Sequence, residues 1–400
     1  MGLRREYQAF NKALCSLYGY ELLTLADGDR PFDFDDTLME DAAKLVYENG
    51  GFDLAQLTAP EVQAIIKETV RVLETAIDSG LPHEVPDTIR YALENNTFVF
   101  SGFKTFHALR EVGLSMLTEK GGIKPFNDFL TDVRLINAQY NHNYLYAEYN
   151  HALGAAQMAA KWHDFEQDGD RYNLQYRTAG DDKVREEHAI LDGTTLPPSD
   201  PFWDMFLPPN GWNCRCTAVQ VRKNKYPASD PELAMKRGMN CTEGAKKAIF
   251  RYNPGKSLQL FPPKHPYYKT PKEVKATTEK MLVKLRRAET LEYARENIVQ
   301  EQCTVSGIDT PVQFTVKGIK EAINQPHEHT LEKLEAIRRI RELLQKGELV
   351  KSEFDKKDNP MVIRYHYVEI SVAGKPSYAV IREMRDGRMV FYTITDKLKT

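Results

Sequence analysis

The chain has 400 residues, of which 42% are hydrophobic and 28% charged, with a net charge of −3. This length exceeds one ordinary hydrophobic core, so we expect a globular protein of two or three domains. No run of eighteen apolar residues is present, and no apolar segment follows the basic N-terminus, which excludes a membrane span, a membrane partner and a secretory signal. Five cysteines at irregular spacings do not form a disulfide framework, so we expect a reducing compartment.

Charge is distributed unevenly along the chain. Residues 305–400 carry a net charge of +3, and the preceding residues carry −6. Three histidines, His327, His329 and His366, also lie in the last quarter. A basic, histidine-bearing module indicates a polyanionic substrate. Ordinary scatter of charge explains the same counts equally well, so charge alone leaves the question open.

The first half of the chain has mainly helical patterns. Residues 1–94 form an N-terminal helical and linker region, in which a proline at Pro60 starts a helix that Gly80 stops. Between residues 98 and 165, apolar side chains recur at steps of three, four or eight, which predicts long helices packed through tyrosine and alanine.

The middle of the chain has a different pattern. We predict a strand at 176–180, a short helix at 182–190 and a strand at 214–222, which together make a loop-rich α+β module within 95–225. Five prolines between 197 and 209 exclude regular structure there. Residues 226–302 are an irregular segment followed by a charged helical connector.

Residues 303–400 predict a separate small α+β domain. Its expected elements are a strand at 312–316, helices at 319–324 and 330–346, and strands at 362–372, 377–384 and 389–394. Asp386-Gly387 is a hairpin signal between the last two strands. The expected fold is therefore multidomain, and its last domain combines helices with a four-stranded antiparallel sheet.

Six short motifs in the middle module carry a resemblance. They are Tyr176-Arg177-Thr178, Arg185 with His188, Leu191-Asp192-Gly193, Phe202-Trp203, Pro208-Pro209 and Asn213-Cys214-Arg215-Cys216. Their order and spacing resemble the phage Mu F-like head morphogenesis family, the minor head proteins that accompany the portal in tailed phages. The resemblance covers residues 95–225. It implies a role in head assembly, phage portal and head proteins as partners, and a location in the virion or the bacterial cytoplasm.

The same module contains candidate zinc ligands. His188, Cys214 and Cys216 offer an imidazole and two thiolates, and Cys241 or His265 would complete a tetrahedron. A Cys-x-Cys pair, however, is tighter than the usual spacing of zinc ligands. We therefore expect packing thiols and no cofactor, with structural zinc as the alternative.

The C-terminal domain is similar in element order and residue types to the barnase–EndoU–colicin–RelE class of small metal-independent ribonucleases. The matching segments are Lys317-Gly318-Ile319-Lys320, Pro326-His327-Glu328-His329, Tyr365-His366-Tyr367, Ile381-Arg382-Glu383 and Phe391 to Asp396. This resemblance implies an endoribonuclease effector, with RNA as substrate and an immunity protein as a further partner.

Cleavage of RNA requires a base, an acid and donors to the phosphate. We expect His366, Arg382, Thr393 and Thr395, on three neighbouring antiparallel strands, to share one surface. Histidine suits both proton-transfer roles because its pKa lies near neutrality.

Two further histidines complete the expected catalytic set, and two lysines are expected to bind nucleic acid. His327 or His329 would face the same cleft, and Lys317 and Lys320 would contact phosphates. Two alternatives stay open, a cross-strand packing role for the strand histidine and a tail that binds nucleic acid or portal without catalysis. A zinc-dependent enzyme in the middle module is the weakest hypothesis.

Overall fold

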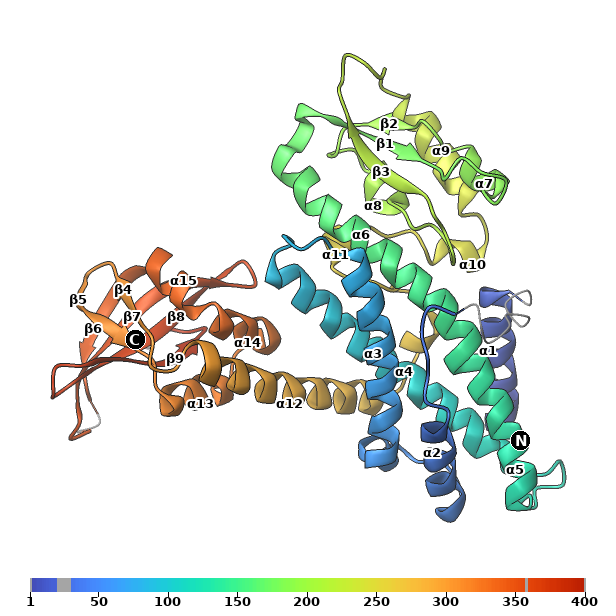
Figure 1. Cartoon of the computed structure of the whole chain (residues 1–400), viewed down its shortest axis with the longest axis horizontal. Helices are drawn as coiled ribbons and strands as arrows, with labels where there is room; N and C mark the ends of the chain where they lie inside the picture. Colours follow the sequence, from blue (N-terminus) through green and yellow to red (C-terminus); the bar gives the residue numbers. More distant parts are fainter. Residues whose placement is uncertain (1, 20–29, 357–358, 399–400) are drawn as a thin grey trace. The chain divides into compact units, whose positions relative to one another are not determined.

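The computed structural model describes residues 2–19, 30–356 and 359–398. The chain divides into two compact units, Met1–Thr278 and Glu279–Thr400. A mainly helical first half, a loop-rich α+β middle module and a small α+β C-terminal domain follow one another, so the predicted fold class is confirmed (Figure 1). Among these described ranges, no helix is both long enough and apolar enough to cross a membrane.

Long helices dominate the start of the first unit. They are α1 (Gly2–Tyr18), α2 (Thr37–Glu48), α3 (Pro60–Gly80), α4 (Asp87–Ser115), α5 (Phe126–Asn137) and α6 (Leu145–Asp168). A π-helical segment, Ala138–Tyr144, joins α5 directly to α6, so the chain is helical without a break from residue 126 to residue 168. Helix α3 begins at Pro60 and ends at Gly80, as the sequence predicts.

Helix α3 approaches α6 closely at its last residue. A Cβ atom on Gly80 would lie 2.6 Å from the carbonyl oxygen of Leu153 and 3.1 Å from the Cβ of Ala156. The first distance is much shorter than a van der Waals contact, and the Leu153 oxygen belongs to the backbone and cannot move aside. Glycine at position 80 therefore permits the close packing of these two helices.

The middle module is built on the C-terminal half of α6. Its elements are β1 (Asn173–Arg177), α7 (Glu186–Ala189), β2 (Thr195–Leu196), α8 (Phe202–Phe206), β3 (Thr217–Val221), α9 (Pro231–Cys241), α10 (Ala245–Ala248) and α11 (Pro254–Ser257). The strands form one antiparallel sheet in the order β2-β1-β3. One cluster of buried side chains closes the module, and it includes Trp162 of α6, Tyr176 of β1 and Trp203 of α8.

Two expectations for this module need correction. The helix expected at 182–190 is limited to Glu186–Ala189, because the backbone of Arg185, at the N-cap position, is extended. The stretch of five prolines does contain regular structure, the five-residue helix α8. Pro201 occupies its N-cap position, before the first turn, where a proline needs no donor within the helix.

The second unit begins within α12 (Lys272–Asn297), most of which belongs to it. Its strands are β4 (Gln302–Val305), β5 (Ile308–Gln313), β6 (Glu348–Phe354), β7 (Val362–Val372), β8 (Lys375–Met384) and β9 (Met389–Thr395). Its helices are α13 (Val316–Asn324), α14 (Thr330–Arg338) and α15 (Ile340–Lys346). Asp386-Gly387 lies in the turn of the predicted hairpin, since β8 and β9 pair antiparallel around it.

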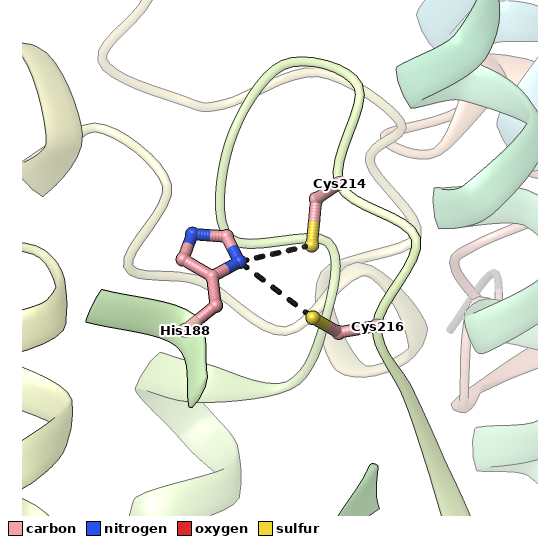
Figure 2. A group of neighbouring side chains, drawn as sticks. All are labelled: His188, Cys214 and Cys216. Carbon is pink, nitrogen blue, oxygen red and sulfur yellow. Dashed lines mark hydrogen bonds between the residues drawn. The ribbon is translucent and has the colours of Figure 1, made fainter. Parts of the chain in front are cut away.

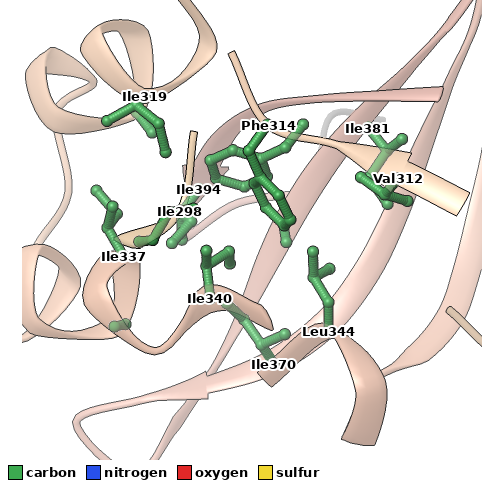
Figure 3. Packing of buried hydrophobic residues seen from close by; sticks show 14 of the residues in the cluster. Ile298, Val312, Phe314, Ile319, Ile337, Ile340, Leu344, Ile370, Ile381 and Ile394 are labelled. Atoms are coloured by element: carbon green, nitrogen blue, oxygen red, sulfur yellow. The ribbon is translucent and has the colours of Figure 1, made fainter. Parts of the chain in front are cut away.

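The sheet of the second unit is larger than expected. It has six strands in the order β4-β5-β9-β8-β7-β6, and β5 pairs with β9 in parallel, where the sequence predicted four antiparallel strands. The core lies between this sheet and the three helices. Figure 3 shows Ile319, Ile337 and Ile340 of the helices pointing toward Ile370 and Ile381 of the strands. Each fully buried aliphatic side chain of this kind stabilises the fold by about 1.5–3 kcal/mol.

Candidate functional site

Two clusters of reactive side chains stand out, one in each unit. The first depends on the pairing of β1 with β3, which aligns Arg177 opposite Thr217. The chain that leaves β1 and the chain that enters β3 therefore lie at the same end of the sheet. Helix α7, which carries His188, lies on the chain that leaves β1, and Cys214 and Cys216 lie on the chain that enters β3. His188 and Cys214 therefore meet although they are 26 positions apart in the sequence.

His188, Cys214 and Cys216 form the first cluster. The Nδ1 atom of His188 lies 3.5 Å from the Cys214 sulfur and 3.6 Å from the Cys216 sulfur. The three potential ligand atoms all lie within 4.8 Å of one another. Figure 2 shows the imidazole ring turned so that this one nitrogen points toward both sulfurs. His188 itself is 4% exposed, while the cysteines are partly buried.

The loop that carries the two cysteines is held in place by side-chain hydrogen bonds. The Tyr176 hydroxyl donates to the side-chain oxygen of Asn210 over 2.9 Å. Asn213, with a left-handed φ of 56°, accepts a 2.9 Å hydrogen bond from the amide of Asn150. Asparagine tolerates this backbone conformation better than most residues do. The positions of the two thiols are thus set by the surrounding fold.

Basic side chains surround the cluster. Arg185 donates to the carbonyl oxygen of Trp212 over 2.6 Å, and Arg215 forms a two-bond ion pair with Asp181.

The hydrogen bond from Cys216, assisted by His188, holds the pKa of the Cys214 thiol well below its usual range. The cluster therefore favours a thiolate at Cys214, the form that binds metals.

The other two candidate zinc ligands, Cys241 and His265, lie outside this group of three. Cys241 belongs to the hydrophobic cluster of the middle module, is 1% exposed, and burial raises its pKa to about 12. Its sulfur is not one of the three grouped ligand atoms, and its role as a ligand stays a prediction. His265 is fully buried and lies 3.0 Å from the Tyr18 hydroxyl. Neither residue joins the group of three ligand atoms.

The second cluster surrounds His366 on β7. Its Nδ1 lies 2.8 Å from the Ser352 hydroxyl of β6, and its Nε2 lies 3.2 Å from the Glu383 carboxylate of β8. The same carboxylate oxygen lies 3.6 Å from the Arg364 guanidinium. The His366 side chain is only 9% exposed. Serine, imidazole and carboxylate are thus connected in a line.

Arg382, Thr393 and Thr395 lie on the opposite face of the sheet from this cluster. His366 pairs with Ile381, which points into the core, and neighbouring residues of a strand point to opposite faces. Arg382 therefore points away from the core, with its guanidinium 3.3 Å from the centre of the Tyr392 ring. Thr393 and Thr395 share this outer face, because they pair with Val380 and Tyr378. The single surface expected for all four residues is not formed.

The remaining predicted residues lie elsewhere in the second unit. His327 is buried beside the Ser377 hydroxyl, 3.2 Å away, and accepts a hydrogen bond from the backbone of His329. Ser377 is four residues along β8 from the partner of His366, which is about 13 Å along a strand. Lys317 and Lys320 are exposed on α13. The predicted catalytic set is therefore divided among separate places, which corrects the expected shared cleft.

Sequence reasoning missed two members of the cluster around His366. Ser352 lies on β6, a strand that was not predicted. The sequence pattern singles out Arg382 and not its neighbour Glu383, although strand alternation places Glu383 on the same side as His366. The alternation of the strand could therefore have identified Glu383, whereas no local sequence pattern indicates Ser352.

Comparison with known proteins assigns parts of both units. The family model described as Phage Mu protein F like protein matches residues 123–219. A second model, described as Large polyvalent protein-associated domain 3, matches residues 282–392. The predicted resemblance of the middle module to Mu F-like proteins is therefore confirmed. No solved structure matches the chain.

Two curated relatives share part of the chain. The Mu-like prophage FluMu F protein of Haemophilus influenzae is 29% identical over 163 residues, which cover 39% of this chain and 38% of the relative. The Putative capsid assembly protein F of Escherichia phage Mu is 48% identical over 42 residues, 10% of each chain. The chain thus aligns with well under half the length of either relative.

Proposed function

We propose that this chain is a minor head protein of a phage or prophage that acts in head assembly, with head and portal proteins as its partners. The observation that carries the proposal is the Mu F-like match over residues 123–219. A relative described as a capsid assembly protein supports the same role. The virion is the expected location of the assembled protein, and the host cytoplasm that of the newly made chain.

The packing of the middle module is consistent with an assembly role. Its three short strands and α8 share one closed core with α6, a 24-residue helix of the bundle. A surface loop fixed on such a core keeps one shape, which lowers the entropy cost of binding a partner. The module would therefore serve as a rigid docking platform in the head.

A genetic experiment separates the role of this module from that of the second unit. In a strain that lacks the gene, the full chain should restore DNA-filled heads. Trp203→Asp, which buries a charge in the core of the module, should not restore them. Ile337→Asp disrupts the core of the second unit in the same way and should still restore heads. Equal restoration by both variants, at matched protein levels, would contradict the proposal.

The second candidate function is metal-independent cleavage of RNA by the second unit, with an immunity protein as a partner. The observation that favours it is the contact of His366 with a carboxylate and a serine hydroxyl, beside the Arg364 guanidinium. A carboxylate can orient an imidazole for proton transfer, and a guanidinium can bind phosphate. The proposed catalytic centre is therefore this cluster and not the set of four residues expected from the sequence. Binding of nucleic acid or portal without catalysis is the alternative.

A further inference from the structure

The distances in the His188 cluster can be compared with those that a metal ion requires. A tetrahedral zinc ion, with Zn–S bonds of about 2.3 Å and Zn–N bonds of about 2.0–2.1 Å, needs nitrogen and sulfur about 3.6 Å apart. The observed distances from His188 Nδ1 to the two sulfurs are 3.5 and 3.6 Å. Two edges of the tetrahedron are therefore already formed by side chains from separate segments.

Hydrogen bonding explains this geometry less well than a shared ion does. An imidazole nitrogen has one in-plane direction, along which it donates one hydrogen or offers one lone pair. Here two sulfurs lie at nearly equal distances from that nitrogen, and thiols are weak hydrogen-bond partners. An ion between the three atoms would use the nitrogen lone pair and both thiolates at once.

The cluster also opens onto a space for a fourth ligand. A cavity of about 220 Å³ is lined by all three residues, together with Lys183, Arg185 and others. Among the residues that the structure describes, no fourth ligating side chain joins the group. A solvent molecule in the cavity can complete the tetrahedron, as in zinc sites with three protein ligands.

We propose that His188 Nδ1, Cys214 Sγ and Cys216 Sγ bind one zinc ion, whose fourth position faces this cavity. Two thiolates balance the charge of the ion, and an imidazole with two sulfurs suits zinc rather than magnesium or calcium. The ion joins α7 to the loop before β3 and so fixes the shape of this end of the module. This inference does not depend on the role in head assembly.

Metal analysis of the full chain tests the site. The protein is purified with a non-thiol reductant after growth in zinc-supplemented medium, and its zinc is measured by mass spectrometry. We expect one zinc ion per chain and five titratable thiols after denaturation with a chelator. Replacement by cobalt should give the absorption of a tetrahedral thiolate complex, which added zinc removes. A folded chain with less than a tenth of an equivalent of either metal, or with two thiols lost to a disulfide, overturns the proposal.

Variants assign the ligands. His188→Gln, Cys214→Ser and Cys216→Ser should each lower zinc affinity by more than about 100-fold. Loss of a residue that only hydrogen-bonds to a ligand lowers metal affinity by about 100-fold at most. Cys15→Ser is the matched control, because Cys15 lies on α1 beside the Tyr144 hydroxyl and outside the cluster. Unchanged affinity in all three ligand variants contradicts the assignment. If a variant fails to fold by circular dichroism, the cobalt spectrum of the unmodified chain decides.

Discussion

Lys104 of α4 and Glu148 of α6 form an ion pair in the interior of the first unit, with side chains 1% and 0% exposed. The Tyr18 hydroxyl of α1 donates to the same carboxylate over 2.6 Å. Burial raises the pKa of Glu148 and lowers that of Lys104, because each charge loses its water. Helices α1, α4 and α6 therefore meet at this ion pair, and each of its two charges needs the other in order to stay buried.

Loss of one partner in this pair should be costly. Lys104→Met leaves the Glu148 carboxylate buried without its cation and should reduce the free energy of unfolding of the first unit by about 3–5 kcal/mol. The double variant Lys104→Met/Glu148→Leu removes both charges and should be more stable than the single variant. Urea denaturation followed by circular dichroism measures both. Surface substitutions usually change the free energy of unfolding by less than about 0.5 kcal/mol. A change this small in the single variant would show that the pair is not buried in solution.

Acid should destabilise the first unit through His151. This side chain is 1% exposed, lies 2.9 Å from the Tyr252 hydroxyl, and burial lowers its pKa to about 4. The unfolded chain binds a proton near pH 6.5 and the folded chain does not, so stability is complete above pH 6.5 and falls toward pH 4.

Between pH 7 and pH 4.5 this residue alone should remove about 2–3 kcal/mol. His151→Gln keeps a hydrogen-bonding group but cannot take up a proton, so the difference in urea stability between the two pH values should shrink by that amount. An unchanged difference would mean that His151 is protonated or solvated in the folded chain.

Lys333 should stabilise the second unit by holding the end of α13. Its ammonium group is fully buried, and it donates to the carbonyl oxygens of Ala322, Ile323 and Gln325. Lys333→Met would leave these carbonyls without a donor, and we expect a loss of about 3 kcal/mol from hydrogen bonds to a charged group. The matched control is Lys346→Met, since Lys346 pairs with Glu342 at the surface and should change stability by less than about 0.5 kcal/mol. Equal losses in the two variants would contradict this role.

Ribonuclease activity, if the second candidate function holds, should depend on the cluster around His366. In the presence of EDTA the full chain should cleave RNA, and His366→Ala should reduce the rate by about 10²–10⁴-fold. Glu383→Gln should reduce it and shift its pH profile, because Glu383 contacts the imidazole. Thr395→Ala, on the opposite face, should have no effect. No cleavage by the unmodified chain would favour a binding role, and activity abolished by EDTA would exclude the metal-independent mechanism.

Much of the helical half was predictable, because periodic apolar residues and the signals at Pro60 and Gly80 are local properties of the sequence. The sheet of the second unit was predictable only in part: β7, β8, β9 and the hairpin were expected, but β4, β6 and the strand order were not. Strands β4 and β6 are its edge strands, and their half-exposed side chains give a weak pattern. The parallel pairing of β5 with β9 joins segments about 75 residues apart, which no local rule encodes.

The candidate sites were predicted in residue type better than in arrangement. His188, Cys214 and Cys216 come together because β1 pairs with β3, whereas Cys241 lies in the hydrophobic cluster of the middle module. Tyr365-His366-Tyr367 has similar neighbours on both sides, so its sequence cannot indicate which face of the sheet the histidine occupies. The register with Ile381 decides it, and register depends on tertiary packing.

The composition of purified particles is the direct test of the proposed role of this chain in a phage head. DNA-filled heads would be isolated on a density gradient and digested for quantitative mass spectrometry, alongside the lysate from which they came. Peptides from both units should be present at a constant ratio to the major head protein across particle fractions. A chain abundant in the lysate but absent from purified heads would contradict the proposed role.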